Sequence, residues 1–152
     1  MDKLLYEGSF LNIIDWVLGW EGGLVDDPDD PGGVTKYGIS QRAHPELDIR
    51  SLTIDQAKAI YYTDYWVKSG AGKLPVPLGA CVFDAAVQHG PGRAKALLAT
   101  SRGDWESYNL NRVDYYVDIT NAKPVRRKYF FGWISRVASL NNKCRELEAK
   151  HG

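Results

Sequence analysis

One segment of this 152-residue chain is so apolar that it limits what the rest can fold into. Residues Leu78–His89 read L-G-A-C-V-F-D-A-A-V-Q-H, and Gly90-Pro91 follows with a helix-ending glycine and a proline suited to the start of another helix. A helix of this composition is stable only when other elements cover it. We therefore expect a mainly helical α+β fold, a helical bundle around a central buried helix.

Three polar residues interrupt this buried segment. Asp84 is costly inside so apolar a helix unless it is ion-paired or faces a cleft. Gln88 follows four residues later and shares its face, and His89 ends the segment. A core or helix-end role is open for each of them, and so is a role in a groove. We keep Asp84, Gln88 and His89 as candidate substrate-binding residues.

The spacing of apolar residues predicts further helices on both sides of this segment. Thr53-Ile-Asp-Gln56 is a capping box that opens a helix ending near Trp66, with Ala57, Ile60 and Tyr61 on its inner side. The other helices are expected over 10–21 with Ser9 as N-cap, 93–101, 105–119 and 126–150. Their expected inward residues are Leu110, Val113 and Val117 in one, and Phe130, Ile134, Val137 and Leu140 in the last, which we expect to fray beyond residue 141.

Composition excludes several classes of function. Lys+Arg and Asp+Glu both number 19, so the formal net charge of zero gives no global attraction to nucleic acid. Cys81 and Cys144 show no C-x-x-C spacing and are expected as free buried thiols. The three histidines, His44, His89 and His151, lack ligand spacing, so we expect no metal and no cofactor.

The first twenty residues do not resemble a targeting segment. They lack the uninterrupted apolar core and small-residue cleavage site of a signal peptide. The apolar stretch Phe10–Trp20 is 11 residues long, whereas a bilayer crossing needs about 20. We therefore expect synthesis in the cytoplasm with no signal peptide or signal-arrest-release segment, no stable membrane insertion, and a monomer.

The stretch Trp20–Ser40, W-E-G-G-L-V-D-D-P-D-D-P-G-G-V-T-K-Y-G-I-S, carries the strongest signal of chemistry. Glu21 ends a helical stripe whose other members, Phe10, Ile14 and Val17, are apolar. Partial burial and the C-terminal end of the helix dipole both favour a protonated carboxyl. An exposed helix-end glutamate without function is the alternative reading.

The residues after Glu21 predict a folded loop and a small β-hairpin beside the helices. Gly22-Gly23 end the helix, and two Asp-Pro steps and Gly32-Gly33 favour turns. We expect a polar loop over 24–31 and a short strand over 34–39. Thr35 and Tyr37 alternate along that strand and would share one face.

Glycoside hydrolysis fits these residues, because it needs one carboxylic acid and usually a second carboxylate. Glu21 is the candidate acid, and Asp30, nine residues later, is the candidate base or electrostatic partner. Thr35 would bind the attacking water, unless it only packs in the strand. Asp26, Asp27 and Asp29 compete with Asp30, with turn and solvent roles as the alternative.

Other hydrolase classes lack their motifs. The chain contains no H-E-x-x-H, no G-x-S-x-G and no phosphate-binding loop with its lysine. The run D-D-P-D-D lacks the spacing of an EF-hand calcium loop.

Four separated motifs, in order, resemble the glycoside hydrolase family 108 N-acetylmuramidases, which include phage endolysins and related bacterial proteins. The first is the Trp20–Ser40 stretch. The others are A-K-A-I-Y-Y-T-D-Y-W at Ala57–Trp66, F-D-A-A-V-Q-H-G-P-G-R-A at Phe83–Ala94, and F-G-W-I-S-R-V at Phe131–Val137, which is similar to a C-terminal predicted peptidoglycan domain.

The resemblance implies a lysozyme-like fold and cleavage of the β-1,4 bond between N-acetylmuramic acid and N-acetylglucosamine. It implies Glu21, Asp30 and Thr35 as catalytic residues, in the order that some phage lysozymes use, and we add Tyr37, Gly38 and Ser40 as substrate contacts. It further implies peptidoglycan strands as the partner, holin-dependent release, and lysis of the host through its cell wall. One domain, 1–152, would contain a muramidase region, 9–97, with a helical segment, 98–150, packed on it.

The sequence departs from the family pattern at Leu24, where an aromatic residue is usual, and at Gln88-His89, where Asn-Ser is frequent. Two rival functions stay open. A lytic transglycosylase would use one glutamate and leave 1,6-anhydromuramic ends, and a non-catalytic protein would bind peptidoglycan without cutting it.

Overall fold

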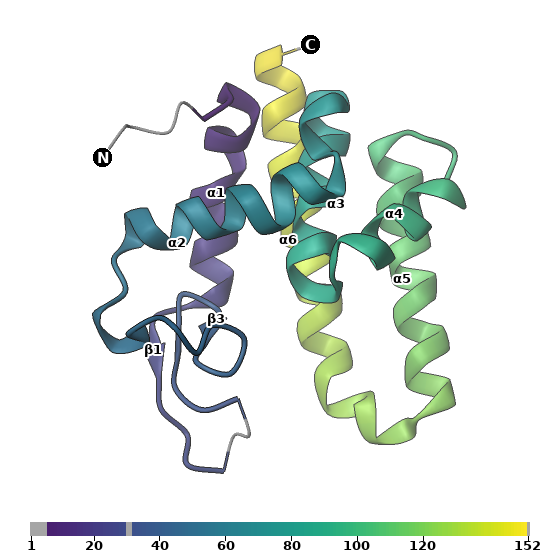
Figure 1. Ribbon diagram of the computed structural model, residues 1–152. Helices are drawn as coiled ribbons and strands as arrows, with labels where there is room; N and C mark the ends of the chain where they lie inside the picture. The colour runs from purple at the N-terminus through teal and green to yellow at the C-terminus, as the bar shows by residue number, and fades with distance from the viewer. Residues whose placement is uncertain (1–5, 30–31, 152) are drawn as a thin grey trace. The chain divides into compact units, whose positions relative to one another are not determined.

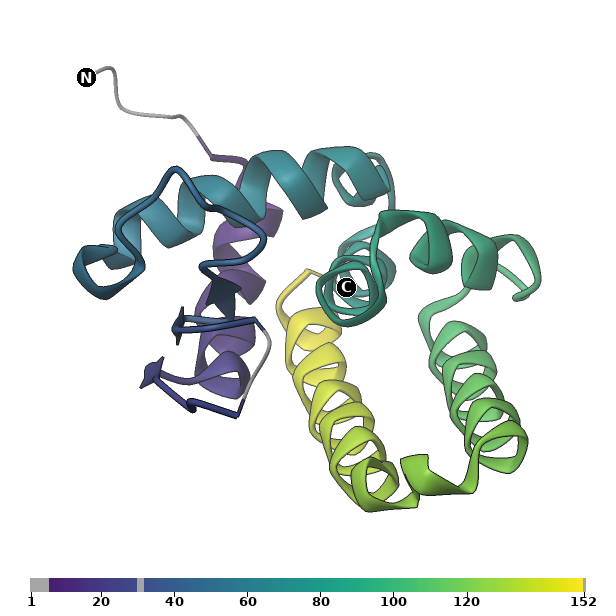
Figure 2. The ribbon, with the colours of Figure 1, turned by 60° about the horizontal axis from the view of Figure 1, so that its bottom comes forward.

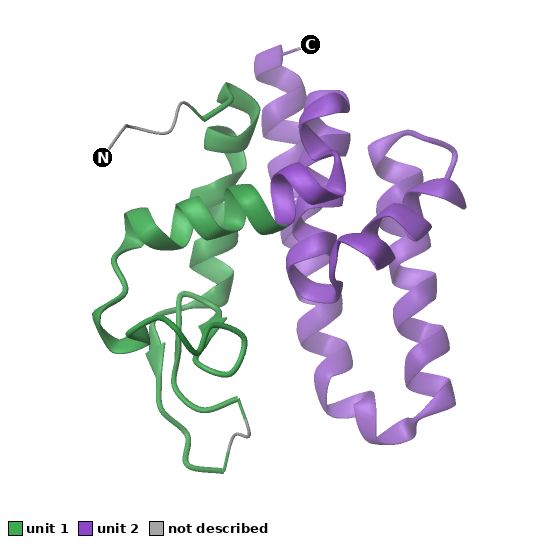
Figure 3. Ribbon diagram, in the orientation of Figure 1, with its two compact units in different colours: residues 1–64 green, residues 65–152 purple. Residues whose placement is uncertain are grey.

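The computed structural model describes residues 6–29 and 32–151 (Figure 1). The chain divides into two compact units, Met1–Asp64 and Tyr65–Gly152, which are coloured separately in Figure 3. The predicted mainly helical architecture with a small sheet is confirmed.

The first unit begins with α1, Gly8–Glu21, which ends at the predicted residue. Its apolar stripe is buried, since Phe10 and Val17 are fully covered and Ile14 is 1% exposed. The predicted N-cap was wrong. Ser9 lies inside the helix, the N-cap position is Glu7, and no side chain caps it.

The capping box at Thr53 is confirmed. The Thr53 hydroxyl accepts a hydrogen bond from the Gln56 N–H at 3.1 Å, and the Gln56 side-chain oxygen accepts one from the Thr53 N–H at 2.9 Å. These bonds open α2, Ile54–Tyr61, after the short 3-10 helix η1, Ile49–Ser51. The helix then widens into a π-helical turn, η2, Tyr62–Val67, so it ends close to the predicted Trp66.

Three short strands form an antiparallel sheet in the order β1-β2-β3: β1 Leu24–Val25, β2 Thr35–Lys36 and β3 Ile39–Ser40. The predicted strand over 34–39 was wrong, and so was its shared face for Thr35 and Tyr37. The chain reverses at Tyr37-Gly38, whose φ angles are 52° and 78°. Positive φ at both central residues is the geometry of a tight two-residue hairpin turn. The predicted 24–31 loop also contributes β1.

The second unit is built around α3, Val76–His89, as predicted. Every residue from Leu78 to Ala86 is buried. The surrounding helices are α4 Pro91–Ala99, α5 Trp105–Ala122 and α6 Arg127–His151, and all three pack on α3. Two 3-10 turns, η3 Ala71–Lys73 and η4 Pro124–Arg126, precede α3 and join α5 to α6.

The inward face predicted for α5 was wrong. Leu110 is 68% exposed and Val117 is 39% exposed, while Val113 is half-buried. The buried face instead carries Tyr108, Arg112 and Tyr116. Counting apolar residues failed here because the neighbouring helix presents a charge, Asp84, that needs polar partners.

The inward face of α6 was predicted in part. Val137 and Leu140 are buried, whereas Phe130 and Ile134 are half-buried. The expected fraying beyond residue 141 was wrong, since α6 continues to His151 and buries Cys144 and Leu147. Over the part of the chain that the structure describes, no helix has the length and hydropathy of a membrane span.

Cys81 and Cys144 are free and buried, as predicted. Their sulfur atoms lie 3.3 Å apart, between α3 and α6. Burial raises the pKa of the Cys81 thiol well above its ordinary value.

We expect a thiol reagent such as Ellman's reagent to leave the native protein almost unlabelled, because both cysteines are buried and the Cys81 thiolate is disfavoured. In guanidinium chloride both thiols should titrate. Rapid labelling of the native protein would contradict the burial of this pair.

Candidate active site

Glu21 stands at the junction of α1 and the sheet. It is the last residue of α1 and is half-buried. Gly22 ends the helix with a φ of 79°, and its N–H donates to the Leu18 carbonyl at 3.1 Å. The glycine pair therefore places this carboxyl at a fixed helix end, where the buried stripe stops.

The β2–β3 turn closes against Glu21. The Tyr37 N–H donates to the Gly23 carbonyl at 3.4 Å, which ties the turn to the residues directly after Glu21. A Cβ atom at Gly38 would lie 2.9 Å from Glu21 Oε2 and closer still to the Tyr61 hydroxyl. Only a glycine fits between these two side chains, and its φ of 78° also favours glycine.

Tyr61, from α2, fixes this turn. Its side chain is 2% exposed, and its hydroxyl donates to the Tyr37 carbonyl at 2.5 Å. Tyr61 was expected only on the inner face of a helix, and its place beside Glu21 was missed. Its membership of the Ala57–Trp66 motif was the one available signal.

The remaining candidates of this unit lie in the same hairpin. Thr35 pairs with Val25 on one side and with Ser40 on the other. Both Thr35 and Ser40 are half-buried. The Ser40 hydroxyl accepts a hydrogen bond from the Ala43 N–H at 3.1 Å, which shapes the turn after β3.

The loop aspartates have separate positions. Asp30 lies outside the residues that the structure describes. Asp26 forms an ion pair with Arg50, and Asp27 Oδ1 accepts a hydrogen bond from the Asp29 N–H at 2.9 Å. All three described aspartates are exposed. Across residues 6–29 and 32–151, no three His, Cys, Asp or Glu side chains gather as a metal site.

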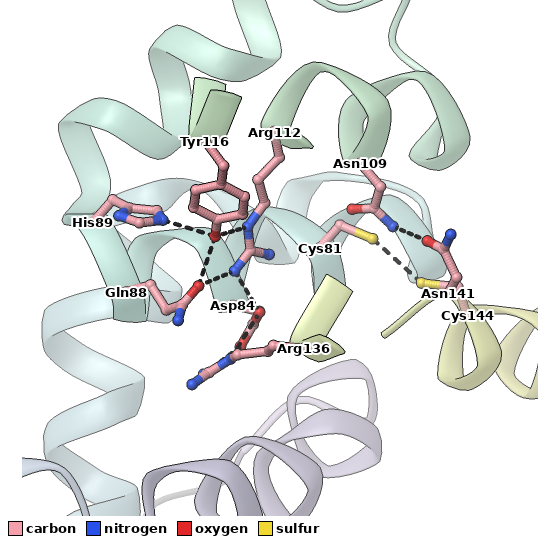
Figure 4. Close-up of polar contacts among 10 residues, drawn as sticks. All are labelled: Cys81, Asp84, Gln88, His89, Asn109, Arg112, Tyr116, Arg136, Asn141 and Cys144. Carbon is pink, nitrogen blue, oxygen red and sulfur yellow. Dashed lines mark hydrogen bonds and ion pairs between the residues drawn. The ribbon is translucent and has the colours of Figure 1, made fainter. Parts of the chain in front are cut away.

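The second group of candidates, in the other unit, centres on Asp84 (Figure 4). Its side chain is fully buried and lies 2.8 Å from Arg112 Nη2 and 2.6 Å from Arg136 Nη2. Burial opposes ionisation, but the two guanidinium charges outweigh it and hold the pKa of Asp84 below its ordinary value. The Asp84 carboxylate has no exposed surface and pairs with arginines of α5 and α6, so the structure does not show the predicted substrate contact.

Gln88 and His89 extend this cluster toward α5. Gln88 Oε1 accepts hydrogen bonds from Arg112 Nη2 at 2.5 Å and from the Tyr116 hydroxyl at 2.7 Å. His89 Nε2 lies 2.9 Å from the same hydroxyl. Figure 4 draws this contact as a dashed line. Burial and the nearby charge of Arg112 lower the pKa of His89 to about 4, so the ring is neutral at pH 7.

The cationic partners, Arg112 and Arg136, were not predicted, and neither was Tyr116, which joins Arg112 to His89. A single aspartate in an apolar helix implies buried cations, but nothing local identifies which arginines supply them.

Comparison with known proteins identifies the family and the fold. The family model described as Glycosyl hydrolase 108 matches residues 14–90, about half of the chain, including most of α1, the sheet, α2 and α3. Among solved structures, SagA from Brucella abortus has a TM-score of 0.76 and 24% identity, and the match covers 93% of this chain and 96% of that chain. The predicted lysozyme-like α+β fold is thereby confirmed. No curated protein matches.

The close packing of Gly38 against Glu21 and Tyr61 predicts how much a side chain at this position would destabilise the protein. Gly38→Ala should destabilise the protein by about 2–4 kcal/mol, because positive φ costs an alanine about 1–2 kcal/mol and the new Cβ adds a clash. Gly103→Ala is the matched control, since Gly103 has a φ of 89° and a Cβ atom there would meet no non-adjacent residue within 4 Å. Gly103→Ala should be destabilised only by the cost of positive φ, about 1–2 kcal/mol.

Chemical unfolding of Gly38→Ala, Tyr61→Phe and the double variant Gly38→Ala/Tyr61→Phe measures the contribution of the clash to the free energy of unfolding. The double variant should be more stable than the sum of its single changes, because it removes the oxygen nearest the new methyl group. Equal losses for Gly38→Ala and Gly103→Ala would show that no such clash exists.

The lowered pKa of His89 predicts a pH dependence of stability. An unfolded histidine titrates near pH 6.5, so between about pH 6.5 and 4 the unfolded state binds more protons at this residue. The free energy of unfolding should therefore fall as the pH falls through this window. Asp84, with its lowered pKa, adds a loss only below its unfolded value, near pH 3.8.

His89→Gln should flatten the stability profile between pH 6.5 and 4, because it removes the group whose pKa is lowered on folding. Unfolding curves at several pH values test this. Profiles of equal slope in both proteins would contradict a neutral, buried His89.

Proposed function

The chain belongs to the glycosyl hydrolase 108 family, and from this premise we propose that it hydrolyses the β-1,4 bond between N-acetylmuramic acid and N-acetylglucosamine. It is a glycoside hydrolase of the N-acetylmuramidase type, and its substrate is peptidoglycan. The observation that carries the proposal is the position of Glu21 at the end of α1, directly against Gly38 and Tyr61.

Glu21 acts as the general acid in this proposal. It donates its proton to the glycosidic oxygen as the bond to the leaving sugar breaks. General acid catalysis requires the acid within hydrogen-bond reach of that oxygen, and a rigid helix end meets this need better than a loop. The absence of a side chain at Gly38 lets the β2–β3 turn pack directly against Glu21.

We assign the second carboxylate to Asp30, by its nine-residue spacing from Glu21 and by the family resemblance. It would activate the water or stabilise the positive charge that develops on the sugar. Thr35, in the strand that pairs with β1, would orient that water. Tyr37, Gly38 and Ser40 of the hairpin are the proposed substrate contacts, and Gln88 and His89 are retained as further candidates.

We further propose that the protein is a phage endolysin, a monomer made in the host cytoplasm and released to the cell wall with a holin. The family resemblance, which includes phage endolysins, is the support for this setting. Lysis of the host would follow from cleavage of its glycan strands.

Digestion of purified sacculi with wild type and Glu21→Gln tests the reaction. We expect soluble fragments with reducing muramic acid ends from the wild type and a loss of at least about a hundredfold in rate for Glu21→Gln, because the amide has no proton to donate. Glu106→Gln, an exposed helix-end glutamate of α5, is the control and should keep full activity.

Mass spectrometry of the fragments separates the rivals. Fragments with 1,6-anhydromuramic acid ends would show that the protein is a lytic transglycosylase and not a hydrolase. If the wild type binds sacculi but releases no soluble fragment, the protein is a non-catalytic peptidoglycan-binding protein. Normal activity of Glu21→Gln would remove this residue as the acid.

A further inference from the structure

The turn between α5 and α6 concentrates positive charge. We call Lys123–Phe131 the hairpin tip; it contains η4 and lies where the two antiparallel helices of Figure 2 are joined. Between residues 119 and 145 the sequence holds seven Lys and Arg residues and no Asp or Glu. Arg136 is buried against Asp84, and Lys143 pairs with Glu146. Four of the seven, however, lie within the hairpin tip and none of those four is buried, so the tip is a local basic surface.

The four cations of the tip are Lys123, Arg126, Arg127 and Lys128. None of them forms an ion pair with a carboxylate among the described residues. Arg126 donates to the Ile119 carbonyl at 3.0 Å, which ties η4 to the end of α5. Arg126 is half-buried in this contact, and the other three cations of the tip are exposed to solvent.

Apolar side chains lie among these charges. Val125 is 70% exposed, Tyr129 is 52% exposed and Phe131 is 81% exposed. Three large apolar side chains within seven residues, each more than half in water, form a patch rather than scattered exposure. A surface that carries both charge and exposed apolar groups calls for a partner with both properties.

Two aromatic rings at and beside the tip, Tyr129 and Trp133, stack within the protein. Trp133 already stacks on Tyr116, with centroids 5.0 Å apart, and on Tyr129, with centroids 5.9 Å apart. The Lys128 ammonium lies 5.0 Å from the centre of the Tyr129 ring. Phe131, by contrast, meets Phe130 only edge-on, with centroids 6.2 Å apart, and is 81% exposed.

We propose that the hairpin tip binds the surface of an anionic phospholipid bilayer. The cations pair with lipid phosphates, and Val125, Tyr129 and Phe131 enter the boundary between headgroups and acyl chains. A soluble polyanion would leave these apolar groups in water, and a neutral glycan would leave the cations unpaired. Binding is peripheral and does not depend on the proposed muramidase reaction.

Sedimentation with vesicles tests the proposal on the full chain. Vesicles with phosphatidylglycerol should bind the protein, and phosphatidylcholine vesicles should bind it at least tenfold more weakly. Arg127→Gln/Lys128→Gln should reduce binding to the anionic vesicles by about thirtyfold, because each basic residue near such a surface contributes about fivefold. Lys95→Gln/Arg102→Gln, two exposed cations outside the tip, is the matched control and should bind as wild type.

A second pair of variants tests the apolar part. Val125→Ser/Phe131→Ser should weaken vesicle binding even at high salt, where charge is screened. Leu110→Ser, 68% exposed on α5 and outside the tip, should not. Equal binding to both lipid types, or loss of binding in the control variants, would overturn the proposal.

The experiments distinguish failure of the lipid-binding proposal from failure of the muramidase proposal. Glu21→Gln should bind vesicles as wild type, and the tip variants should digest purified sacculi at the wild-type rate. If the tip variants instead lose sacculus binding and keep vesicle binding, the tip recognises the cell wall and the lipid proposal is wrong. Thermal unfolding of each variant verifies that it is folded.

Discussion

The second unit depends on a single buried charge. Asp84 sits in the most apolar helix of the chain, where an unpaired carboxylate would not stay ionised. Arg112 of α5 and Arg136 of α6 both reach it, so one residue joins three helices. Removing one partner of such a pair costs about 3–5 kcal/mol, since it leaves a buried charge uncompensated.

This charge also determines the composition of the helix beside it. Two arginines around one aspartate leave a net positive charge and several donors to satisfy. The Gln88 oxygen and the Tyr116 hydroxyl take two of the Arg112 donors, at 2.5 and 2.8 Å. The inner face of α5 is therefore polar and aromatic, while its aliphatic residues, such as Leu110, face water.

A different constraint shapes the first unit. Glu21, Gly38 and Tyr61 come from α1, the β2–β3 turn and α2, and they meet in a space that admits no further atom at Gly38. The hydrogen bond from Tyr61 to the Tyr37 carbonyl holds the turn in its left-handed conformation. A carboxyl that stands on a helix end and contacts a fixed turn is positioned before any substrate arrives, and such preorganisation is what acid catalysis needs.

The sequence was sufficient where the determinants are local. The capping box at Thr53, the glycine end of α1 and the apolar run of α3 each depend on neighbouring residues, and each was predicted correctly. Glu21 was singled out in the same way, from its place on a helical stripe. The strand over 34–39 was misassigned because its turn depends on positive φ at Tyr37, a residue type that rarely adopts it.

The missed residues share a different property, which is distance along the chain. Tyr61 bonds a residue 24 positions away, and Arg136 pairs with one 52 positions away. Arg112 of α5 is fully buried because it pairs with Asp84 of α3. No pattern within α5 itself predicts that this arginine is buried. Sequence periodicity therefore singled out the candidate acid, Glu21, while Tyr61 beside it and, in the second unit, the arginines around Asp84 required the three-dimensional structure.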